Sequence, residues 1–439
     1  MVEPGRAGGR GKALRLAPFR ALRFSPDVVP DLAAVTCPPY DVIGENGVAA
    51  WEAADPHNVV RLILPRPGAR ENRYTHAARD LRRWLDHGVL RQDAAPALYV
   101  YEQTTGAGTA LGLVGAVSLH DPDERVVLPH EEVFPAPVAD RTELMAATGA
   151  QLEPILLTYG GGGDASAAVD AALDTEPVIS VTTIDGSSHR VWRLSEPATM
   201  AAIESDLRPR QALIADGHHR YAAYRTLRDR LQGQGQIDRP DLRVRTSQAA
   251  RYGLAMLVDA QRHPLRLGSI HRSIADVSLE KAVAAATHGF DAMTALAADV
   301  DLANALDRAG RAGPAFVLSD GRNSALLEHP IGPVVEGALP QTRSQRWRGL
   351  DASIACEFVL PHVFGVQDAD RRVAYHHEAA EAIMRAHRLG GVALLIRPAS
   401  HADVLAVAAN GERMPRKSTS FGPKPRTGLL MRLLADPQV

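Results

Sequence analysis

The chain has 439 residues, 45% of them hydrophobic and 23% charged, and its formal net charge is −2. This composition is typical of a soluble globular protein with about two or three domains. The lack of a basic excess argues against nucleic acid as a partner. No apolar run reaches the length of a membrane-spanning helix, so a membrane is not expected as a partner either.

Residues 1–15 are rich in Gly, Arg and Pro and contain no continuous apolar stretch. We therefore expect a disordered N-terminus rather than a signal peptide. The two cysteines, Cys37 and Cys356, match no metal-binding or redox spacing. A reduced, cytoplasmic setting is the expectation that follows.

An N-terminal region is predicted over residues 16–125, where strand patterns alternate with an amphipathic helix. Tyr74, Leu81 and Trp84 share one face of that helix. The expected elements, in chain order, are extended structure over 18–45 with a turn at CPPYD (37–41), a strand over 57–65, a helix over 72–90, and a hairpin of strands over 96–105 and 111–120.

A central region is predicted over residues 126–260, and a C-terminal region over 261–439. The expected central elements are a short strand, a Pro-rich turn and a helix within 126–148, strands over 155–159, 188–194 and 211–215, a helix reaching Leu231, and a strand over 251–260. The expected C-terminal elements are a turn near His271, Ala-rich helices within 279–310, strands near 314–328, a helix over 350–364, a strand over 391–398, a helix over 401–412 and a loop from 414. The predicted fold class is mixed, α/β or α+β.

The stretch IADGHHRY at 214–221 joins an apolar strand to the start of an amphipathic helix. Gly217 permits a tight turn there. A helix start presents free backbone N–H groups and the positive end of a dipole. His218, His219 and Arg220 beside it predict an anion site, and phosphate is the usual anion. Asp216 is interpreted either as a helix cap or as a ligand of Mg²⁺.

Further polar clusters stand at strand ends or helix starts, where functional sites are commonly built. The loop from 414 to 428 is basic and rich in Gly and hydroxyl groups, and the apolar run LLMRLL follows it. A loop tied at both ends in this way is a candidate phosphate or carboxylate clamp. Besides Arg220, the candidate substrate- or phosphate-binding residues are Tyr40, Asp41, Asn58, Arg61, Asp140, Arg141, His271, Arg272, Lys417, Ser418, Thr419 and Lys424.

The segments PPYDV, DPHNVVRL, PHEEVFPAPVADR, IADGHHRY, HRSI and MPRKSTSFGPKPRTGL occur in this order. In that order they resemble the pattern of the domain-of-unknown-function 1015 family, over residues 16 to 434. This resemblance implies no activity. The Asp-Gly-His-His-Arg motif alone is also similar to the phosphate-binding motif of ParB-type partition proteins, sulfiredoxins and free-serine kinases. It implies a ParB/sulfiredoxin-like element that binds a nucleotide at the strand–turn–helix junction, with a further sheet-and-helix region towards the C-terminus.

The first functional hypothesis is phosphoryl transfer between a nucleotide, ATP or ADP, and a small hydroxy-amino acid such as serine. Such chemistry needs cations around the phosphates, usually Mg²⁺ held by carboxylates, and a positioned base. We expect Asp216 or Asp140 to hold Mg²⁺, and Glu131, next to His130, to act as the base. Arg141 or Arg272 is expected to pair with a substrate carboxylate. The predicted catalytic set is His130, Glu131, Asp216, His218 and His219. The same residues also suit hydrolysis of a phosphorylated small molecule.

Two alternatives stay open. A metal-dependent hydrolase would use His130, Glu131 and one residue of the pair His218 and His219 as ligands, because adjacent histidines point in different directions. A non-enzymatic, ParB-like nucleotide-binding protein would need a DNA-reading helix pair or a basic face, and the sequence suggests neither. The sequence carries no indication of oligomeric state.

Overall fold

The computed structural model describes residues 12–44, 47–68, 71–233 and 248–435. Most of the segment predicted to be disordered, residues 1–11, lies outside this description. Of the following residues, Ala13 and Leu14 are buried. No described helix has both the length and the apolar character needed to cross a membrane. Cys37 and Cys356 are free thiols.

The chain divides into two compact units, each assembled from segments that are separated in the sequence. Unit 1 comprises residues 1–129, 133–265 and 423–439, and unit 2 comprises residues 130–132 and 266–422. The last segment of unit 1 therefore follows unit 2 in the chain. The two units are described separately below.

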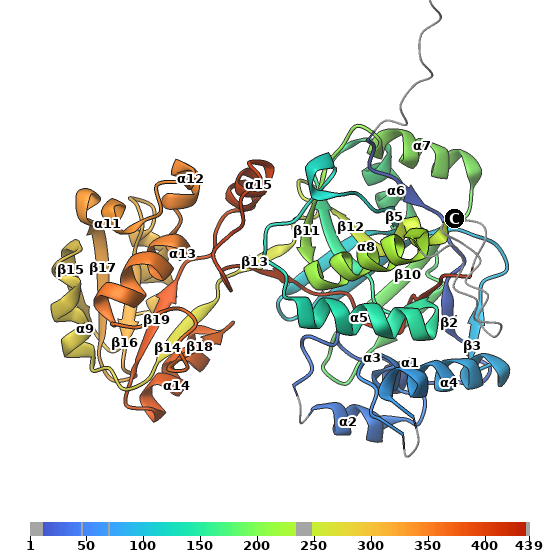
Figure 1. Cartoon of the computed structure of the whole chain (residues 1–439), viewed down its shortest axis with the longest axis horizontal. Helices are drawn as coiled ribbons and strands as arrows, with labels where there is room; N and C mark the ends of the chain where they lie inside the picture. The colour runs from blue at the N-terminus through green and yellow to red at the C-terminus, as the bar shows by residue number, and fades with distance from the viewer. Residues whose placement is uncertain (1–11, 45–46, 69–70, 234–247, 436–439) are drawn as a thin grey trace, which may run out of the picture. The chain divides into compact units, whose positions relative to one another are not determined.

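Unit 1 is built on a large mixed sheet whose strand order is β6-β11-β8-β12-β5-β4-β10-β9, with β1 beside β5 (Figure 1). β11 pairs in parallel with β6 and antiparallel with β8. The described strands of unit 1 are β1 (Leu16–Ala17), β2 (Leu22–Phe24), β3 (Leu90–Gln92), β4 (Leu98–Thr105), β5 (Gly108–Ser118), β6 (Val127–Leu128), β7 (Ala150–Gln151), β8 (Ile155–Tyr159), β9 (Ile179–Thr182), β10 (Ser188–Leu194), β11 (Ala212–Asp216), β12 (Tyr252–Asp259) and β21 (Arg432–Leu433).

Helices pack around this sheet. The described helices of unit 1 are α1 (Leu32–Val35), α2 (Gly47–Ala54), α3 (Val60–Ile63), α4 (Arg73–Asp86), α5 (Pro135–Thr148), α6 (Gly163–Leu173), α7 (Pro197–Leu207) and α8 (His218–Gly233). α5 packs along α8 on one side and along α4 on the other (Figure 1). Phe134, just before α5, contacts His219 in the first turn of α8, and Glu143 further along α5 pairs with Arg230 near the end of α8. The two helices therefore run in parallel and begin at the same end of unit 1.

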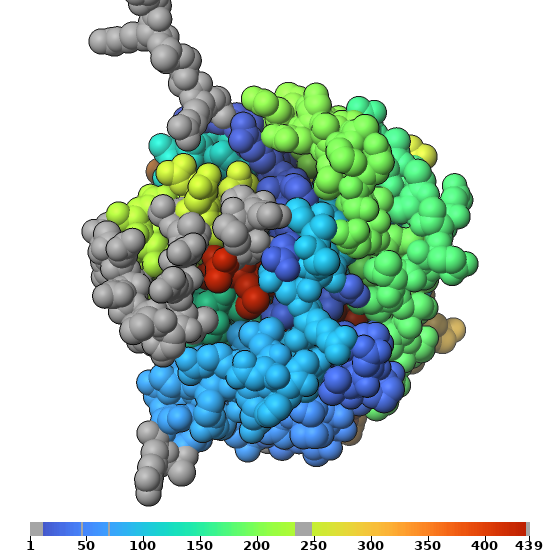
Figure 2. All heavy atoms as spheres, turned by 90° about the vertical axis from the view of Figure 1, so that its right-hand side faces the viewer, coloured from blue at the N-terminus to red at the C-terminus, as the bar shows by residue number. Residues whose placement is uncertain are grey.

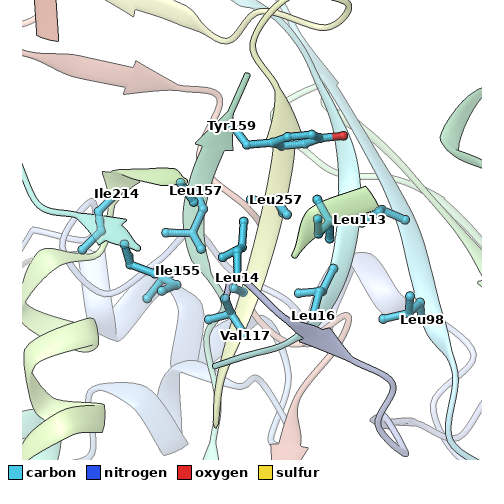
Figure 3. Close-up of a cluster of buried hydrophobic side chains, with 14 of the residues drawn as sticks. Leu14, Leu16, Leu98, Leu113, Val117, Ile155, Leu157, Tyr159, Ile214 and Leu257 are labelled. Atoms are coloured by element: carbon cyan, nitrogen blue, oxygen red, sulfur yellow. The ribbon is translucent and has the colours of Figure 1, made fainter. Parts of the chain in front are cut away.

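The core of unit 1 is a continuous cluster of aliphatic side chains from the central strands (Figure 3). Leu157 and Leu257 are buried on the neighbouring strands β8 and β12, and the N-terminal segment adds Leu14 and Leu16. Full burial of one such side chain contributes about 1.5–3 kcal/mol. Gly115 on β5 makes room for this segment, because a Cβ atom there would lie 2.6 Å from Leu16.

Unit 2 contains an antiparallel sheet with strand order β15-β17-β16-β19-β14-β18, and the two-stranded pair β13-β20. Its described strands are β13 (Arg266–Gly268), β14 (His271–Ile274), β15 (Phe290–Leu296), β16 (Phe316–Ser319), β17 (Ser324–Pro330), β18 (Val373–His376), β19 (Val392–Ile396) and β20 (Ser420–Gly422). Its described helices are α9 (Leu279–Ala286), α10 (Leu302–Ala309), α11 (Gly332–Ala338), α12 (Gln345–Arg348), α13 (Asp351–Ile354), the π-helix η3 (Ala355–Val363), α14 (Ala379–Arg388) and α15 (His401–Ala409).

The predicted mixed fold class is confirmed, and so are many of its elements. The helix expected over 72–90 is α4, capped by Asn72, whose side chain accepts from the N–H groups of Tyr74 and Thr75. The predicted hairpin is β4 and β5, and the strands expected over 155–159 and 188–194 are β8 and β10. The strand, turn and helix of the IADGHHRY stretch are also observed.

The strand prediction over 57–65 was wrong. Residues 60–63 form the short helix α3 instead. The Asn58 side chain accepts a hydrogen bond from the Val60 N–H at 3.0 Å and donates to the Ala34 carbonyl at 2.7 Å. This local capping by an Asn side chain stabilises a helical turn within an apolar stretch that reads as a strand.

Two further predictions in unit 2 need correction. His271 and Arg272 lie on β14, paired with β18 and β19, and not near a turn. Residues 290–296 form β15 within a stretch predicted to be helical. In both places pairing with strands distant in the sequence overrides the local pattern.

Candidate functional site

The junction of β11 and α8 places the predicted motif in a tight turn. Gly217 has φ +93°, a conformation that favours glycine, and a Cβ atom there would lie 2.8 Å from Ile155. α8 begins at the next residue, His218. The end of the strand and the start of a sixteen-residue helix therefore meet at a single glycine.

The Asp216 carboxylate lies buried at this junction and is held by two cations. Its Oδ2 accepts from Nη2 of Arg220 at 2.5 Å, and its Oδ1 lies 2.5 Å from Nζ of Lys424. Burial alone raises the pKa of Asp216, but Lys424 and Arg220 outweigh it and hold the pKa below its usual value. Asp216 is therefore an anion that organises cations around the start of α8.

Lys424 connects this carboxylate to the CPPYD turn. Its Nζ donates to Oδ2 of Asp41 at 2.8 Å, so one ammonium group bridges Asp41 and Asp216. The lysine belongs to the C-terminal segment of unit 1, which Figure 2 shows in red beside blue N-terminal parts of the unit. Three segments that are far apart in the sequence thus bring together four candidate residues, Asp41, Asp216, Arg220 and Lys424.

Arg220 is buried beside this group, with 4% of its surface exposed. Its Nη1 donates to the Pro154 carbonyl at 2.8 Å, and its guanidinium lies 5.8 Å from the centre of the Tyr40 ring. Its Nε is buried and has no hydrogen-bond partner among the described residues. A buried guanidinium N–H without an acceptor is costly unless a ligand or water satisfies it.

Glu153 is the residue of this cluster that the sequence did not suggest. Its Oε1 accepts from the Tyr40 N–H at 2.9 Å and from Oγ1 of Thr427 at 3.3 Å. Its Oε2 lies 3.9 Å from Nη1 of Arg141. Burial raises the pKa of Glu153, although Arg220 and Arg141 oppose the shift. A single glutamate before a Pro at the start of an apolar strand carries no motif that marks it.

Arg141 and Asp140 lie next to Glu153 and Tyr40. The Arg141 guanidinium stacks over the Tyr40 ring at 4.5 Å and donates to the Ile63 carbonyl at 2.7 Å. Asp140 accepts from Nε of Arg141 at 2.9 Å and from the Tyr74 hydroxyl at 2.8 Å. Burial raises the pKa of Asp140, but Arg141 and the other partners of this carboxylate together have the larger opposite effect. The pKa therefore lies below its usual value and the carboxylate stays charged. Asp140 thus fixes Arg141 in place.

A small cavity lies next to these charged groups, with a volume of about 20 Å³, which is room for about one water molecule. Arg141, Glu153 and Arg220 supply its charged lining. Its other lining residues are Leu144, Met145, Ala150, Gln151, Leu152 and Tyr224. The walls are mainly apolar with three convergent charged side chains, and in this structure the cavity is far smaller than the pockets of about 300–1,000 Å³ that enclose a small molecule.

The two motif histidines differ in their surroundings. His218 is buried at the first position of α8. Nε2 of His219 accepts from the Phe134 N–H at 3.0 Å, and the two rings stack with centroids 5.9 Å apart. His219 therefore links the start of α8 to the start of α5.

Asn58 and Arg61 have local roles: Asn58 caps α3, and Arg61 donates to the Glu52 carbonyl at 2.8 Å.

The remaining candidates lie in unit 2. Nε2 of His130 is 3.0 Å from Oγ1 of Thr419, which donates to Oε1 of Glu131 at 3.2 Å. The predicted phosphate clamp, the loop over residues 414–428, therefore contacts His130 and Glu131 directly through Thr419. In that loop, Ser418 donates to the Pro415 carbonyl at 2.6 Å, and Lys417 has φ +50°.

His271 and Arg272 are held by the sheet of unit 2. Nδ1 of His271 accepts from the Ile396 N–H at 3.2 Å, and burial lowers the pKa of His271 to about 4. Arg272 is buried and donates to the carbonyls of Ile270 at 2.6 Å and Arg416 at 3.2 Å. These contacts fix the loop that contains Arg416 to β14.

The residues around Asp216 do not fit the predicted Mg²⁺ site. Both carboxylate oxygens already contact a cation. Across the described residues, no group of three or more His, Cys, Asp or Glu side chains is arranged to hold a metal ion. Mg²⁺ prefers about six oxygen ligands. Because both oxygens of Asp216 are occupied, Mg²⁺ could bind this carboxylate directly only by displacing Lys424 or Arg220.

The fold and the ionic cluster define a mixed α/β protein with a candidate anion site at a strand–turn–helix junction. The chain belongs to the family described as protein of unknown function (DUF1015), whose model matches residues 16–353. This confirms the predicted family. The matched range contains the motifs from PPYDV to HRSI, and the MPRKSTSFGPKPRTGL stretch follows it. No curated protein matches the sequence.

Solved structures that the chain resembles include free serine kinases. A free serine kinase in complex with AMP is 14% identical, with a TM-score of 0.33 over 69% of this chain and 86% of that one. SbnI with a C-terminal truncation, from Staphylococcus aureus, is 12% identical, with a TM-score of 0.35 over 73% of this chain and 87% of that one. A conserved hypothetical protein from Pyrococcus furiosus is 14% identical, with a TM-score of 0.31 over 69% of this chain and 89% of that one.

Proposed function

We propose that unit 1 binds the phosphate groups of a nucleotide, ATP or ADP, at the start of α8. The protein then transfers a phosphoryl group between that nucleotide and a small hydroxy-amino acid such as serine. The observation that carries this proposal is the buried guanidinium of Arg220, the third residue of α8, whose Nε has no partner among the described residues. A phosphate oxygen is the acceptor that best satisfies such a group.

The charges around Arg220 support this assignment. Lys424 and Arg220 are fixed by Asp216, so both cations are positioned before any ligand arrives. Preorganised cations stabilise the charge that spreads over a transferring phosphoryl group without the cost of reorganisation. Any Mg²⁺ would accompany the nucleotide through its phosphate oxygens, because the Asp216 oxygens are already occupied.

Glu153 is the proposed general base for the acceptor hydroxyl. It is buried, it lines the cavity, and its pKa is raised by burial. A carboxylate with a raised pKa accepts a proton more readily as the hydroxyl oxygen forms its bond to phosphorus. Arg141, next to Glu153, is proposed to bind the carboxylate of the amino acid. The earlier assignment of Glu131 as the base stays a prediction.

The test is thermal unfolding of the purified protein with ADP, ATP, serine and phosphoserine, each with and without Mg²⁺. A ligand that binds only the folded state raises the midpoint. We expect ADP and ATP to do so, and Arg220→Lys, which keeps the charge but loses the planar fork, to abolish the effect. Lys281 is an exposed lysine on α9, and Lys281→Met is the control variant. It should show the same rise of the midpoint with ADP and ATP as the wild type.

Protein that shows the ADP shift is then incubated with ATP and serine, and phosphoserine is measured by phosphorus NMR. Formation of phosphoserine that Glu153→Gln abolishes supports the proposal. Binding without transfer to any hydroxy-amino acid would favour the non-enzymatic nucleotide-binding alternative. The absence of any midpoint shift with all four ligands would overturn the phosphate site itself.

A further inference from the structure

Lys424 occupies the position between two carboxylates that a divalent metal ion takes in many phosphoryl-transfer sites. Its Nζ lies 2.8 Å from Oδ2 of Asp41 and 2.5 Å from Oδ1 of Asp216. Asp41 belongs to the N-terminal part of unit 1 and Asp216 to the end of β11. Bridging oxygens from two separate segments is what a bound Mg²⁺ does in such sites.

The backbone around Lys424 holds the ammonium in this position. Pro423 and Pro425 flank the lysine and restrict it to an extended conformation. Two residues further on, Nε of Arg426 donates to Oγ1 of Thr36 at 2.8 Å, and the Thr427 backbone pairs with Cys37. The backbone that carries Lys424 is therefore held in place, and the two carboxylate partners hold the ammonium.

The ammonium group also has capacity for a ligand. A lysine ammonium has three N–H donors. Within the described part of the chain, two of them face Asp41 and Asp216, and the third has no protein acceptor. The nearby Nε of Arg220 also lacks one. Because Lys424 and Arg220 hold the same carboxylate, a phosphate that reaches this carboxylate can accept hydrogen bonds from both cations.

From this geometry we infer that Lys424 is the resident cation of the phosphate site and takes the place of a protein-bound divalent metal. The inference rests on the proposed function, because it assigns the cation of the same site. Two consequences follow. The wild-type protein has no metal site at Asp41 and Asp216, and a phosphate ligand binds there without a metal.

The first experiment measures Mn²⁺ binding by electron paramagnetic resonance, with the metal alone and no nucleotide. We expect no site in the wild type, and in Lys424→Met a site at least tenfold tighter than any residual wild-type binding. The double variant Asp41→Asn, Lys424→Met should lose it again, and Lys281→Met should match the wild type. Wild-type Mn²⁺ binding that Asp216→Asn removes would overturn the inference, as would the absence of binding in folded Lys424→Met.

The second experiment uses only the wild type, so it stands even if Lys424→Met fails to fold. AMP binding is measured by calorimetry in EDTA and again in Mg²⁺, because a monophosphate chelates Mg²⁺ weakly and a large metal effect would report a protein-bound ion. We expect the two dissociation constants to agree within threefold. A tenfold or greater requirement for Mg²⁺ would overturn the inference. If AMP binds under neither condition, the expected metal-free phosphate binding is overturned, whereas the proposed function is decided by the midpoint shifts with ADP and ATP. The Mn²⁺ experiment still decides the role of Lys424.

Discussion

Arg220 donates to Asp216 and to the Pro154 carbonyl from a fully buried position. Replacing it by Met would leave Asp216 with Lys424 alone and would leave Glu153 facing one cation fewer. We expect Arg220→Met to lower the free energy of unfolding by about 3–5 kcal/mol, the usual effect of breaking a buried ion pair. Urea unfolding measures it.

The double variant Arg220→Met, Asp216→Asn is the control, because it removes both charges of the pair. It should recover part of the loss seen in Arg220→Met. Wild-type stability in Arg220→Met would contradict the role given to this pair.

The buried His189 should make the folded protein less stable in acid, because its folded state binds a proton poorly. Burial lowers the pKa of His189 to about 4, helped by the charge of Arg426, and its Nδ1 lies 2.9 Å from the Tyr101 hydroxyl. An unfolded histidine titrates near pH 6.5, so the unfolded state binds the proton first and stability falls as the pH drops from about 6.5 towards 4. We expect His189→Gln to reduce this loss between pH 7 and 5 by about 1–2 kcal/mol. Urea unfolding at both pH values measures it, and the exposed His288→Gln should change nothing.

The candidate site was only partly predictable at the residue scale. Asp216, Arg220, Asp41 and Lys424 stood out because they occur in polar clusters at strand and helix ends. Their mutual contact could not be foreseen, since Asp41 and Lys424 are separated by 383 positions. Glu153 could not be found at all, because its importance comes from burial beside two arginines and not from its sequence neighbours.

At the scale of the elements, the junction of β11 and α8 depends on one glycine. Gly217→Ala would force an alanine into φ +93° and bring its Cβ atom to 2.8 Å from Ile155. We expect a loss of about 1–3 kcal/mol in stability, the usual cost of such backbone strain, together with weaker ADP binding. Thermal unfolding with and without ADP measures both effects. Gly106→Ala, where no atom lies within 4 Å of the new Cβ, should leave both unchanged.

Elements with strong local patterns were predictable, and elements decided by distant partners were not. β8 was predicted at its observed bounds because ILLTY is apolar throughout and a glycine loop follows it. α3 was mistaken for a strand because the Asn58 side chain that caps it is held by the Ala34 carbonyl of α1, 24 positions earlier in the chain. The helix expected over 350–364 exists, but its second half, Ala355–Val363, is a π-helix that contains Pro361. No periodicity distinguishes that state in advance.

At the scale of the whole molecule, unit 1 is completed by its C-terminal segment. Leu429, Leu430, Met431 and Leu434 are buried, and Arg432 donates to Gln151 and to backbone carbonyls. At about 1.5–3 kcal/mol for each buried side chain, their combined burial matches the total stability of an ordinary domain. We expect a chain that ends at Gly422 to lose the cooperative unfolding of unit 1.

Circular dichroism and limited proteolysis of that shortened chain measure the effect. A synthetic peptide of residues 423–439 added in trans should restore protection, and a peptide of the same composition in scrambled order should not. A shortened chain that unfolds like the wild type would contradict the structural role of the segment.

The same segment sets an order on biosynthesis. A ribosome emits residues 266–422 before Lys424, so unit 2 is complete while unit 1 still lacks Lys424, Arg426 and β21. During that interval the newly made β-sheet of unit 1 carries uncovered apolar side chains, a state that favours aggregation. Until Lys424 is in place, the Asp216 carboxylate lacks the cation that bridges it to Asp41. Any phosphate chemistry at this site therefore requires residues 423–435 to have left the ribosome and packed onto unit 1.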